Sequence, residues 1–227
     1  MSTYFVTAID TDAGKTVVTG LLGKYLKQLG QDVITMKLSQ TGCESLSDDI
    51  AVHRQLMGME LLEDDINGLT CPYLFRFPAS PHLAAAMENV NISEDKLVKA
   101  IECIHEKYEH VLVEGVGGLM VPINEELLVA DFIQNHHFQV ILVTSGRLGS
   151  INHTLLTLEV LKARNIPVYG IIYNHYPVTE VQITADSAKL LRRYLQSYYP
   201  QALWGEVPIV HESATEKLQL ELPGWFE

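Results

Sequence analysis

Five short runs of almost uniformly apolar residues constrain the fold of this chain more than any other feature. They are Tyr4–Ala8, Asp32–Lys37, His110–Val113, Gln139–Thr144 and Val168–Tyr173, each bounded by Gly, Pro or polar residues. A strand with one face in water alternates apolar and polar residues, so these runs predict strands that are buried on both faces. Strands of this kind form a parallel sheet that helices cover on each side.

The segments between these runs have the spacing of helices with one apolar face. They are Thr16–Leu29, the stretch from Ser93 through Ile104, Asn152–Arg164 and Thr179–Tyr198. Alternating strands and helices predict a doubly wound α/β fold with a mostly parallel central sheet, flanked by helices as in P-loop NTPases. With no internal repeat and no linker rich in Pro, Gly or Ser, residues 1–227 are expected to form one domain. The irregular stretch Gly58–Pro81 is predicted to be a long loop at the active site.

The charge balance excludes some classes of partner. Lys and Arg number 16 against 28 Asp and Glu, a formal net charge of −12, which argues against binding to nucleic acid or to an anionic membrane. No apolar run approaches the roughly 20 residues that cross a bilayer, and no secretory signal opens the chain. Three widely spaced cysteines, Cys43, Cys71 and Cys103, indicate free thiols in a reducing compartment. A cytoplasmic protein is therefore expected.

The first predicted strand runs directly into a sequence suited to binding phosphate, Ala8-Ile9-Asp10-Thr11-Asp12-Ala13-Gly14-Lys15-Thr16. A turn that leads into a helix N-terminus presents N–H groups to an anion, a Lys reaches the β- and γ-phosphates, and a Thr hydroxyl binds Mg²⁺. Gly14, Lys15 and Thr16 supply these parts between a strand and a helix, which favours a nucleotide site over a chance match. Ala8 stands where the pattern has Gly, and Ala fits there if its φ stays negative.

Two further strand ends carry a charge. One strand ends at Lys37, and the next ends in a segment that contains Glu114 followed by Gly-rich sequence. In open α/β sheets, ligands bind outside the carboxyl ends of the strands, so Lys15, Lys37 and Glu114 are predicted to face one crevice.

This crevice is also expected to hold Mg²⁺. Glu114 would share it with Thr16, since Mg²⁺ prefers a few carboxylates together with water and phosphate oxygens. Asp48 is a candidate for a second carboxylate, but spacing alone does not separate it from Asp49. Asp48 could instead cap the helix that follows, because Ser and Asp are preferred at that position.

Taken in order, these motifs resemble those of the dethiobiotin synthetase family. Ala8–Thr16 is similar to the family's GTDTxxGKT loop with two changes, and Lys37–Gly42 to its Lys-Pro-x-x-Ser/Thr-Gly segment with Leu38 for Pro. Further similar segments are Ser47-Asp48, Pro78–His82, Val113–Gly118 (VEGxGG), Leu148–Thr157 (LGxINHxLLT), Asn174 and Gly205–Pro208. VEGxGG and LGxINHxLLT together are specific, whereas Gly-Lys-Thr alone is not.

The resemblance implies a ligase reaction of biotin synthesis. ATP would drive carboxylation and ring closure of 7,8-diaminopelargonate with CO₂, giving dethiobiotin, ADP and phosphate. A carbamate of one amine would attack the γ-phosphate, and the second amine would close the ring on the resulting carbamic-phosphoric anhydride. Such a reaction needs positioning and charge stabilisation rather than a protein nucleophile. Mg²⁺ would be the cofactor, ATP a co-substrate, and the enzyme a homodimer with its active site at the interface.

The resemblance also implies a role for individual residues. Lys37, Lys15 and Thr11 would be catalytic. ATP would be bound by Asp12, Ala13, Gly14, Lys15, Thr16, Val17, Asn174 and Pro208. The substrate would be held by Thr11, Lys37, Thr41, Gly117, Gly118, Leu148, Gly149, Ser150 and Asn152, with the backbone of Gly149–Asn152 supplied by the partner subunit. The metal ligands would be Thr16, Asp48 and Glu114, so the resemblance favours Asp48 over Asp49.

Two other functional classes share some of these features. A partitioning-type ATPase has the same sheet and Gly-Lys-Thr loop, but usually carries an additional Lys where this chain has Ala8 and Ile9. It would also need a basic patch or an amphipathic terminal helix, and the sequence shows neither. A nucleotide-binding module that has lost its chemistry is the second alternative, suggested by the changes at Ala8, Ile9 and Leu38. Turnover measured beside ATP binding separates these classes.

Overall fold

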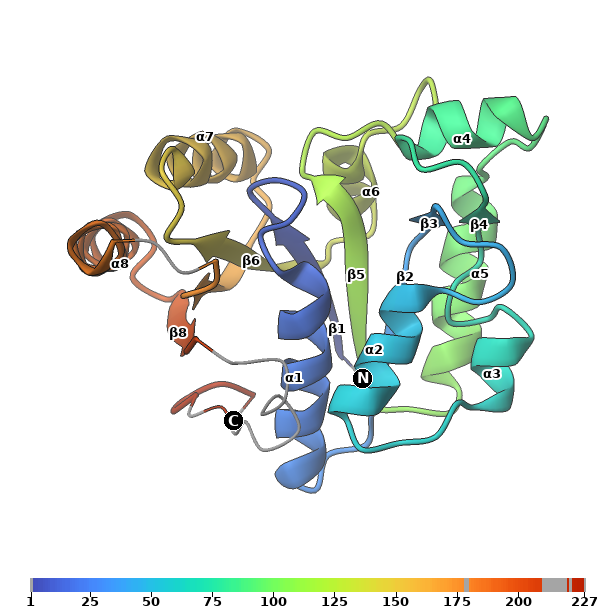
Figure 1. Cartoon of the computed structure of the whole chain (residues 1–227), viewed down its shortest axis with the longest axis horizontal. Coiled ribbons are helices and arrows are strands. Elements are labelled where there is room, and N and C mark those ends of the chain that lie inside the picture. Colours follow the sequence, from blue (N-terminus) through green and yellow to red (C-terminus); the bar gives the residue numbers. More distant parts are fainter. Residues whose placement is uncertain (1, 178–179, 210–219, 221, 227) are drawn as a thin grey trace.

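A computed structural model describes residues 2–177, 180–209, 220 and 222–226. Its centre is a six-stranded sheet in the order β2-β5-β1-β6-β7-β8, in which every pairing is parallel. The strands are β1 (Ser2–Ala8), β2 (Val33–Lys37), β5 (His110–Gly118), β6 (Gln139–Ser145), β7 (Val168–Asn174) and β8 (Leu203–Val207) (Figure 1). The five predicted strands are confirmed. The sixth strand, β8, is not predicted from the sequence, because it lies at the sheet edge and contains Gly and Glu.

Helices cover both faces of this sheet. They are α1 (Lys15–Gln28), α2 (Asp48–Leu56), α3 (Glu63–Ile66), α4 (Pro81–Met87), α5 (Glu94–His105), α6 (Val129–Asn135), α7 (Ser150–Ala163) and α8 (Val181–Tyr198). Helices α1 and α2 pack against each other and against β2, α5 and α6 pack on β5, and α7 packs on β6 and α8 (Figure 1). The start predicted for the last helix, Thr179, lies outside the described residues. Among the helices described, none is long and apolar enough to cross a membrane.

The order of the strands brings the predicted crevice together. Strand β1 lies between β5 and β6, and β5 also pairs with β2, so that Lys37 at the end of β2 is the register partner of Glu114. Ala8 is extended in β1, where it pairs with Gly118 and Val143, so its φ is negative as expected. The left-handed positions of the following loop fall on Asp12 (φ 58°) and Gly14 (φ 90°) instead.

Residues 58–81 are more ordered than the long loop that the sequence predicts. They contain the short helix α3 and a strand, β4 (Leu74–Phe75), which pairs in parallel with β3 (Gln40–Thr41) in a separate two-stranded sheet. A buried ion pair between Arg54 of α2 and Asp65 of α3, with an N–O distance of 2.7 Å, fastens this excursion to the main body. Only its end, Pro78–Pro81, reaches the pocket described below.

The last described residues, 222–226, pack over strands β7 and β8 next to α1. Trp225 is buried, and a Cβ added at Gly170 of β7 would lie 2.6 Å from its ring. The ring of Phe226 lies 5.0 Å from that of Tyr4 in β1. Residues 222–226 thus cover part of the sheet and belong to its core.

Candidate active site

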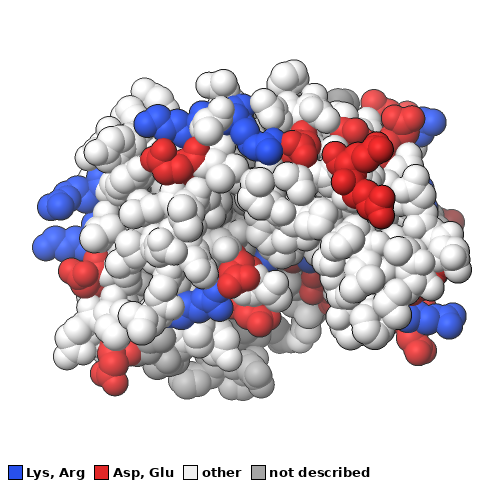
Figure 2. All heavy atoms as spheres, turned by 90° about the horizontal axis from the view of Figure 1, so that it is seen from above, with Lys and Arg blue, Asp and Glu red and all other residues white. Residues whose placement is uncertain are grey.

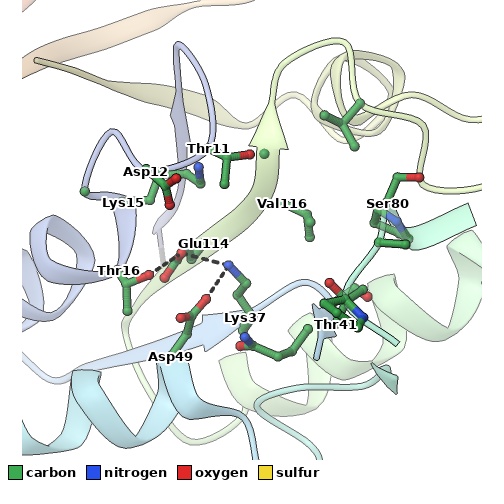
Figure 3. A pocket seen from close by; sticks show the side chains of 18 of the residues that line it. Thr11, Asp12, Lys15, Thr16, Lys37, Thr41, Asp49, Ser80, Glu114 and Val116 are labelled. Carbon is green, nitrogen blue, oxygen red and sulfur yellow. Dashed lines mark hydrogen bonds and ion pairs between the residues drawn. The ribbon is translucent and has the colours of Figure 1, made fainter. Parts of the chain in front are cut away.

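A pocket of about 860 Å³ opens at the carboxyl ends of β1, β2 and β5. It brings together ten of the predicted site residues, namely Thr11, Asp12, Gly14, Lys15, Thr16, Val17, Lys37, Thr41, Glu114 and Gly117 (Figure 3). The remaining lining residues are Ser39, Gln40, Asp49, Pro78, Ala79, Ser80, Pro81, Val116, Val121 and Tyr176. Figure 2, seen from the side of the strand ends, shows acidic and basic side chains in small separate groups without a continuous basic patch on that face.

The loop between β1 and α1 has the geometry of a phosphate cradle. Gly14 is the N-cap of α1 in a left-handed conformation, so the helix begins at Lys15 with its free N–H groups at the pocket. The Lys15 ammonium donates to the carbonyl of Asp10 at 3.1 Å. Burial, together with the nearby charge of Lys37, lowers the pKa of Lys15 to about 8. The negative charge of a phosphate group bound here would stabilise the charged form of this buried ammonium.

Asn174, at the end of β7, supports this loop from behind. Its amide nitrogen donates to the carbonyl of Ala13 at 3.1 Å, and its amide oxygen accepts from the backbone N–H of Tyr176 at 3.1 Å. A Cβ at Gly14 would overlap that amide nitrogen. In this structure the amide of Asn174 therefore holds the loop, and its reading of a nucleotide base stays a prediction.

The floor of the pocket is a network of charged groups centred on Glu114. Its Oε1 accepts from the Thr16 hydroxyl at 3.0 Å and from the Lys37 ammonium at 2.8 Å. Lys37 also forms an ion pair with Asp49 at 2.6 Å, and donates to the carbonyl of Gly115 at 3.1 Å (Figure 3). The network joins α1, β2, α2 and β5 at one point, so the fold holds these side chains at fixed positions relative to one another.

The network keeps Lys37 and Glu114 charged although both are buried. Burial alone would raise the pKa of Glu114, but the Lys37 charge and a hydrogen bond from His53 outweigh it and hold that pKa well below its usual range. Burial alone would lower the pKa of Lys37, yet the carboxylates of Glu114 and Asp49 together raise it. At neutral pH Glu114 is thus a carboxylate and Lys37 an ammonium.

Asp49 lines the pocket, and Asp48, which the resemblance favours as a metal ligand, is not among the lining residues, so the choice between them as ligand stays a prediction. Ser47 caps α2, accepting from the N–H of Ile50 at 3.2 Å, so Asp48 is the first helical residue and points to solvent. Asp49 is turned by about 100° from it, as successive helical residues are, and lines the pocket. The position within the helix separates the two, which the motif Ser-Asp-Asp alone does not.

Several other predicted residues lie away from the pocket. Leu148, Gly149 and Asn152 are exposed around the start of α7, and Leu148 is 87% exposed. Ser150 is buried there and Pro208 is exposed, whereas Ala13 is a buried residue of the phosphate loop itself, between Asp12 and Gly14. Gly118 lines a separate hollow of about 340 Å³ with Met120 and Leu156. The roles that the resemblance gives to these residues therefore stay predictions.

His53 is the site residue that sequence reasoning missed. It is fully buried in α2, and its Nε2 lies 2.7 Å from Oε2 of Glu114. The signal in the sequence is its spacing: His53 follows Asp49 by four residues, so both side chains lie on one face of the helix. This spacing becomes informative only once Asp49 is known to face the pocket.

The donor set fits Mg²⁺ bound together with a nucleotide. The hydroxyl of Thr16 and the carboxylates of Glu114 and Asp49 are oxygen donors, which Mg²⁺ prefers, and they face the phosphate loop. Within the described part of the chain, no group of three or more His, Cys, Asp or Glu is arranged to hold a metal by itself. Phosphate oxygens and water would therefore have to complete the coordination.

Known structures show which fold this site is built on. MinD from Aquifex aeolicus superposes with a TM-score of 0.57 at 16% identity, covering 96% of this chain and 87% of that one. A ParA family ATPase from Chlorobium tepidum superposes with a TM-score of 0.55 at 17% identity, covering 95% and 87%. At this level of identity the likeness concerns the fold alone, which is that of P-loop NTPases.

Sequence comparison gives the family. Residues 2–217 match the family model described as an AAA domain. The chain is 48% identical over 207 residues to ATP-dependent dethiobiotin synthetase BioD 2 of Pasteurella multocida, covering 91% of this chain and 97% of that one. It is 47% identical over 205 residues to ATP-dependent dethiobiotin synthetase BioD of Chlorobaculum tepidum, covering 90% and 84%. Since almost half of its residues are shared with these enzymes over nine-tenths of its length, the chain belongs to the dethiobiotin synthetase family.

Proposed function

We propose that this protein closes the ureido ring of dethiobiotin from 7,8-diaminopelargonate, CO₂ and ATP, with release of ADP and phosphate. The observation that carries the proposal is the convergence of Lys15, Thr16, Lys37 and Glu114 in one pocket of a chain that belongs to this family. The reaction would take place in the cytoplasm, where ATP is available.

The phosphate loop would bind and orient the triphosphate. The N-terminus of α1 offers N–H groups to the β-phosphate, and the buried ammonium of Lys15 adds a charge beside them. Both groups are in place before the substrate arrives, so they stabilise the charge of the transferred phosphoryl group without reorganisation. Val17 and Asn174 lie next to the same loop and are proposed to contact the nucleoside.

Mg²⁺ would be held by Thr16, Glu114 and Asp49, with Asp49 taking the place that the resemblance gave to Asp48, and it would neutralise charge on the β- and γ-phosphates. Lys37 is placed to stabilise the carbamate oxygen and the transferred phosphoryl group. Its ammonium lines the pocket and is charged at neutral pH because two carboxylates flank it. The diamine carbamate would be oriented by the hydroxyls of Thr11 and Thr41 and the backbone of Gly117.

The proposed site is completed by a second copy of the chain. Gly149 caps α7 with a φ of 93°, so this helix of 14 residues presents its N-terminus where Leu148 and Asn152 are exposed. Such an end can receive the carboxylate of the substrate in a partner's pocket. The hollow near Gly118 adds exposed apolar surface from Met120 (49% exposed) and Leu156 (58% exposed). Sedimentation velocity should show a dimer, which Leu156→Glu dissociates.

The proposed reaction is tested by phosphate release with Mg²⁺, ATP and bicarbonate, with and without 7,8-diaminopelargonate. We expect release that depends on the diamine and is matched by an equal amount of dethiobiotin detected by mass spectrometry. ATP binding without any effect of the diamine would keep the nucleotide site and reject the substrate. Omission of bicarbonate and CO₂ is the control, because a carbamate cannot form without them.

A further inference from the structure

Two side chains of helix α2 contact the charged network. Asp49 pairs with Lys37 at 2.6 Å, and His53, one turn later on the same face, contacts Glu114 at 2.7 Å. Since Lys37 and Glu114 pair with each other at 2.8 Å, the four side chains form a closed ring anchored on one helix. The mechanism proposed above uses Asp49, Lys37 and Glu114 but gives His53 no role.

The Glu114 carboxylate has hydrogen-bond partners on both of its oxygens. Glu114 is fully buried, and its Oε1 accepts from both Thr16 and Lys37 on the pocket side. In the region that the structure describes, the hydrogen-bond partner of Oε2 is the imidazole of His53. Without that partner Oε2 would be a buried carboxylate oxygen with no donor, and the carboxylate could regain one by rotating away from the pocket.

The imidazole of His53 acts here as a hydrogen-bond donor. A carboxylate oxygen accepts hydrogen bonds, so in the contact at 2.7 Å the Nε2–H of His53 donates to Oε2 of Glu114. The other ring nitrogen, Nδ1, is buried without a hydrogen-bond partner among the described residues. The polar contact of this ring is therefore the one directed at Glu114.

We propose that His53 is a positioning residue that holds Glu114 with Oε1 facing Thr16 and the pocket, ready to share Mg²⁺ with phosphate oxygens. The proposal rests on the metal site of the proposed function, but not on the identity of the second substrate. Hydrogen bonds from neighbours that orient a metal-ligating group commonly contribute 10- to 100-fold to metal affinity. The arrangement predicts an effect of that size on the metal bound with nucleotide.

Two amide variants separate this role from simple packing. In His53→Gln the side-chain amide nitrogen is as many bonds from the backbone as Nε2, so it can donate to Glu114. In His53→Asn the amide nitrogen corresponds to Nδ1 and falls short. Both variants bury an amide of similar polarity, so their difference reports on the hydrogen bond. Leu56→Ala, which truncates a buried side chain elsewhere in α2, controls for a general loss of stability.

Mn²⁺, added as a spectroscopic substitute for Mg²⁺, is titrated into each variant in the presence of ADP and followed by electron paramagnetic resonance. We expect His53→Asn to weaken Mn²⁺ binding about 10- to 100-fold, while His53→Gln and Leu56→Ala stay within about threefold of the parent. ADP affinity without metal should be unchanged in all three. This readout needs no diamine, so loss of the substrate assignment would leave it standing.

Two results would overturn the proposal. One is Mn²⁺ affinity in His53→Asn equal to that of the parent, which would leave His53 a packing residue. The other is equal weakening in the Asn and Gln variants, because the loss would then follow from disturbed packing and not from the bond to Glu114. If His53→Asn does not fold, the comparison of His53→Gln with His53→Phe decides in the same way, since Phe keeps the ring and removes the donor.

Discussion

At the scale of single residues, the site depends on charges that are buried together. Lys37 lies between two carboxylates, Glu114 has three partners, and removing any member leaves the others without compensation. The sequence predicts Lys37 and Glu114 because a charge at the end of a buried strand is conspicuous. Asp49 and His53 lie on a helix with many other polar residues, so nothing in the local sequence marks them.

The neighbouring acids Asp48 and Asp49 offer a matched pair of variants. Asp49→Asn should weaken Mg²⁺-dependent ATP binding about tenfold or more, because it removes a carboxylate from the pocket floor. Asp48→Asn should bind ATP as the parent does, because that side chain points to solvent. Isothermal titration of ATP with and without Mg²⁺ checks both. A larger loss in Asp48→Asn would restore the assignment that the motif resemblance favours.

Lys37→Met keeps most of the side-chain volume and removes the charge. Turnover should fall by about 10²- to 10³-fold, the typical effect of losing one group that stabilises developing charge. The free energy of unfolding should fall too, since Glu114 and Asp49 lose their shared partner. Steady-state phosphate release is therefore measured on protein whose folding is verified by circular dichroism. Near-normal turnover in the folded variant would remove Lys37 from the mechanism.

At the scale of elements, each loop at the pocket is held by a neighbour that is distant in sequence. The phosphate loop is fixed by Asn174 of β7, and Arg147, before α7, forms an ion pair with Asp10 of the same loop. The excursion that contains α3 is fixed by the buried pair of Arg54 and Asp65. Contacts of this kind form only after the sheet has assembled, so local sequence does not predict them.

Gly14→Ala tests the close approach between the phosphate loop and β7. Its backbone has a φ of 90°, and an added Cβ would overlap the amide of Asn174. We expect ATP affinity to fall below detection by isothermal titration while the sheet stays folded by circular dichroism. Gly30→Ala is the matched control, because Gly30 also has a positive φ but nothing lies within 4 Å of its added Cβ. Equal ATP affinity in both variants would contradict the crowding argument.

The pair of Arg54 and Asp65 predicts part of the acid sensitivity of the fold. Burial raises the pKa of Asp65, but hydrogen bonds from Arg54 and the Leu62 backbone outweigh it, so the pKa in the folded protein lies below that of a free aspartate. The stabilisation is therefore complete above about pH 4 and is lost as the pH falls through the folded pKa. Urea unfolding from pH 2.5 to 6 should show that the free energy of unfolding falls less steeply with decreasing pH in Asp65→Asn than in the parent.

The same variant should also lose stability at neutral pH. Arg54 would then be buried without a charged partner, which typically costs about 3–5 kcal/mol. Glu63→Gln, an exposed change in the same short helix, should leave both the stability at neutral pH and its fall with decreasing pH as in the parent. An equally steep fall of the free energy of unfolding in Asp65→Asn would mean that this pair does not govern the response to acid.

At the scale of the whole molecule, the pocket and the C-terminal residues lie on different parts of one sheet. The pocket opens at the carboxyl ends of β1, β2 and β5, and residues 222–226 pack over Gly170 of β7 and Gly205 of β8. Buried apolar residues from Tyr4 to Phe226 form one continuous core. This core agrees with the prediction that residues 1–227 form one domain. The statement stays a prediction, since part of the C-terminal region lies outside the described residues.

Trp225→Ala should therefore reduce stability without affecting the chemistry. Loss of a buried Trp typically costs about 3–5 kcal/mol, because a cavity remains where the ring filled the space above Gly170. Urea unfolding measures the loss, and turnover of the folded variant should match the parent at low temperature. The free energy of unfolding of Trp225→Phe should lie between those of the parent and the Ala variant, because Phe fills part of the cavity. A change in KM for ATP in the Ala variant would instead indicate coupling between the C-terminal residues and the pocket.

The sequence by itself determined the layers of this protein and the nature of its site. Strands buried on both faces must be uniformly apolar, and a phosphate loop must combine Gly, Lys and Thr between a strand and a helix, so both are readable along the chain. Tertiary structure alone decided that Asp49 and not Asp48 faces the pocket, that His53 turns Glu114, and that Asn174 braces Gly14. These are contacts between elements far apart in sequence, and their geometry exists only once the parallel strands have brought those elements to one edge.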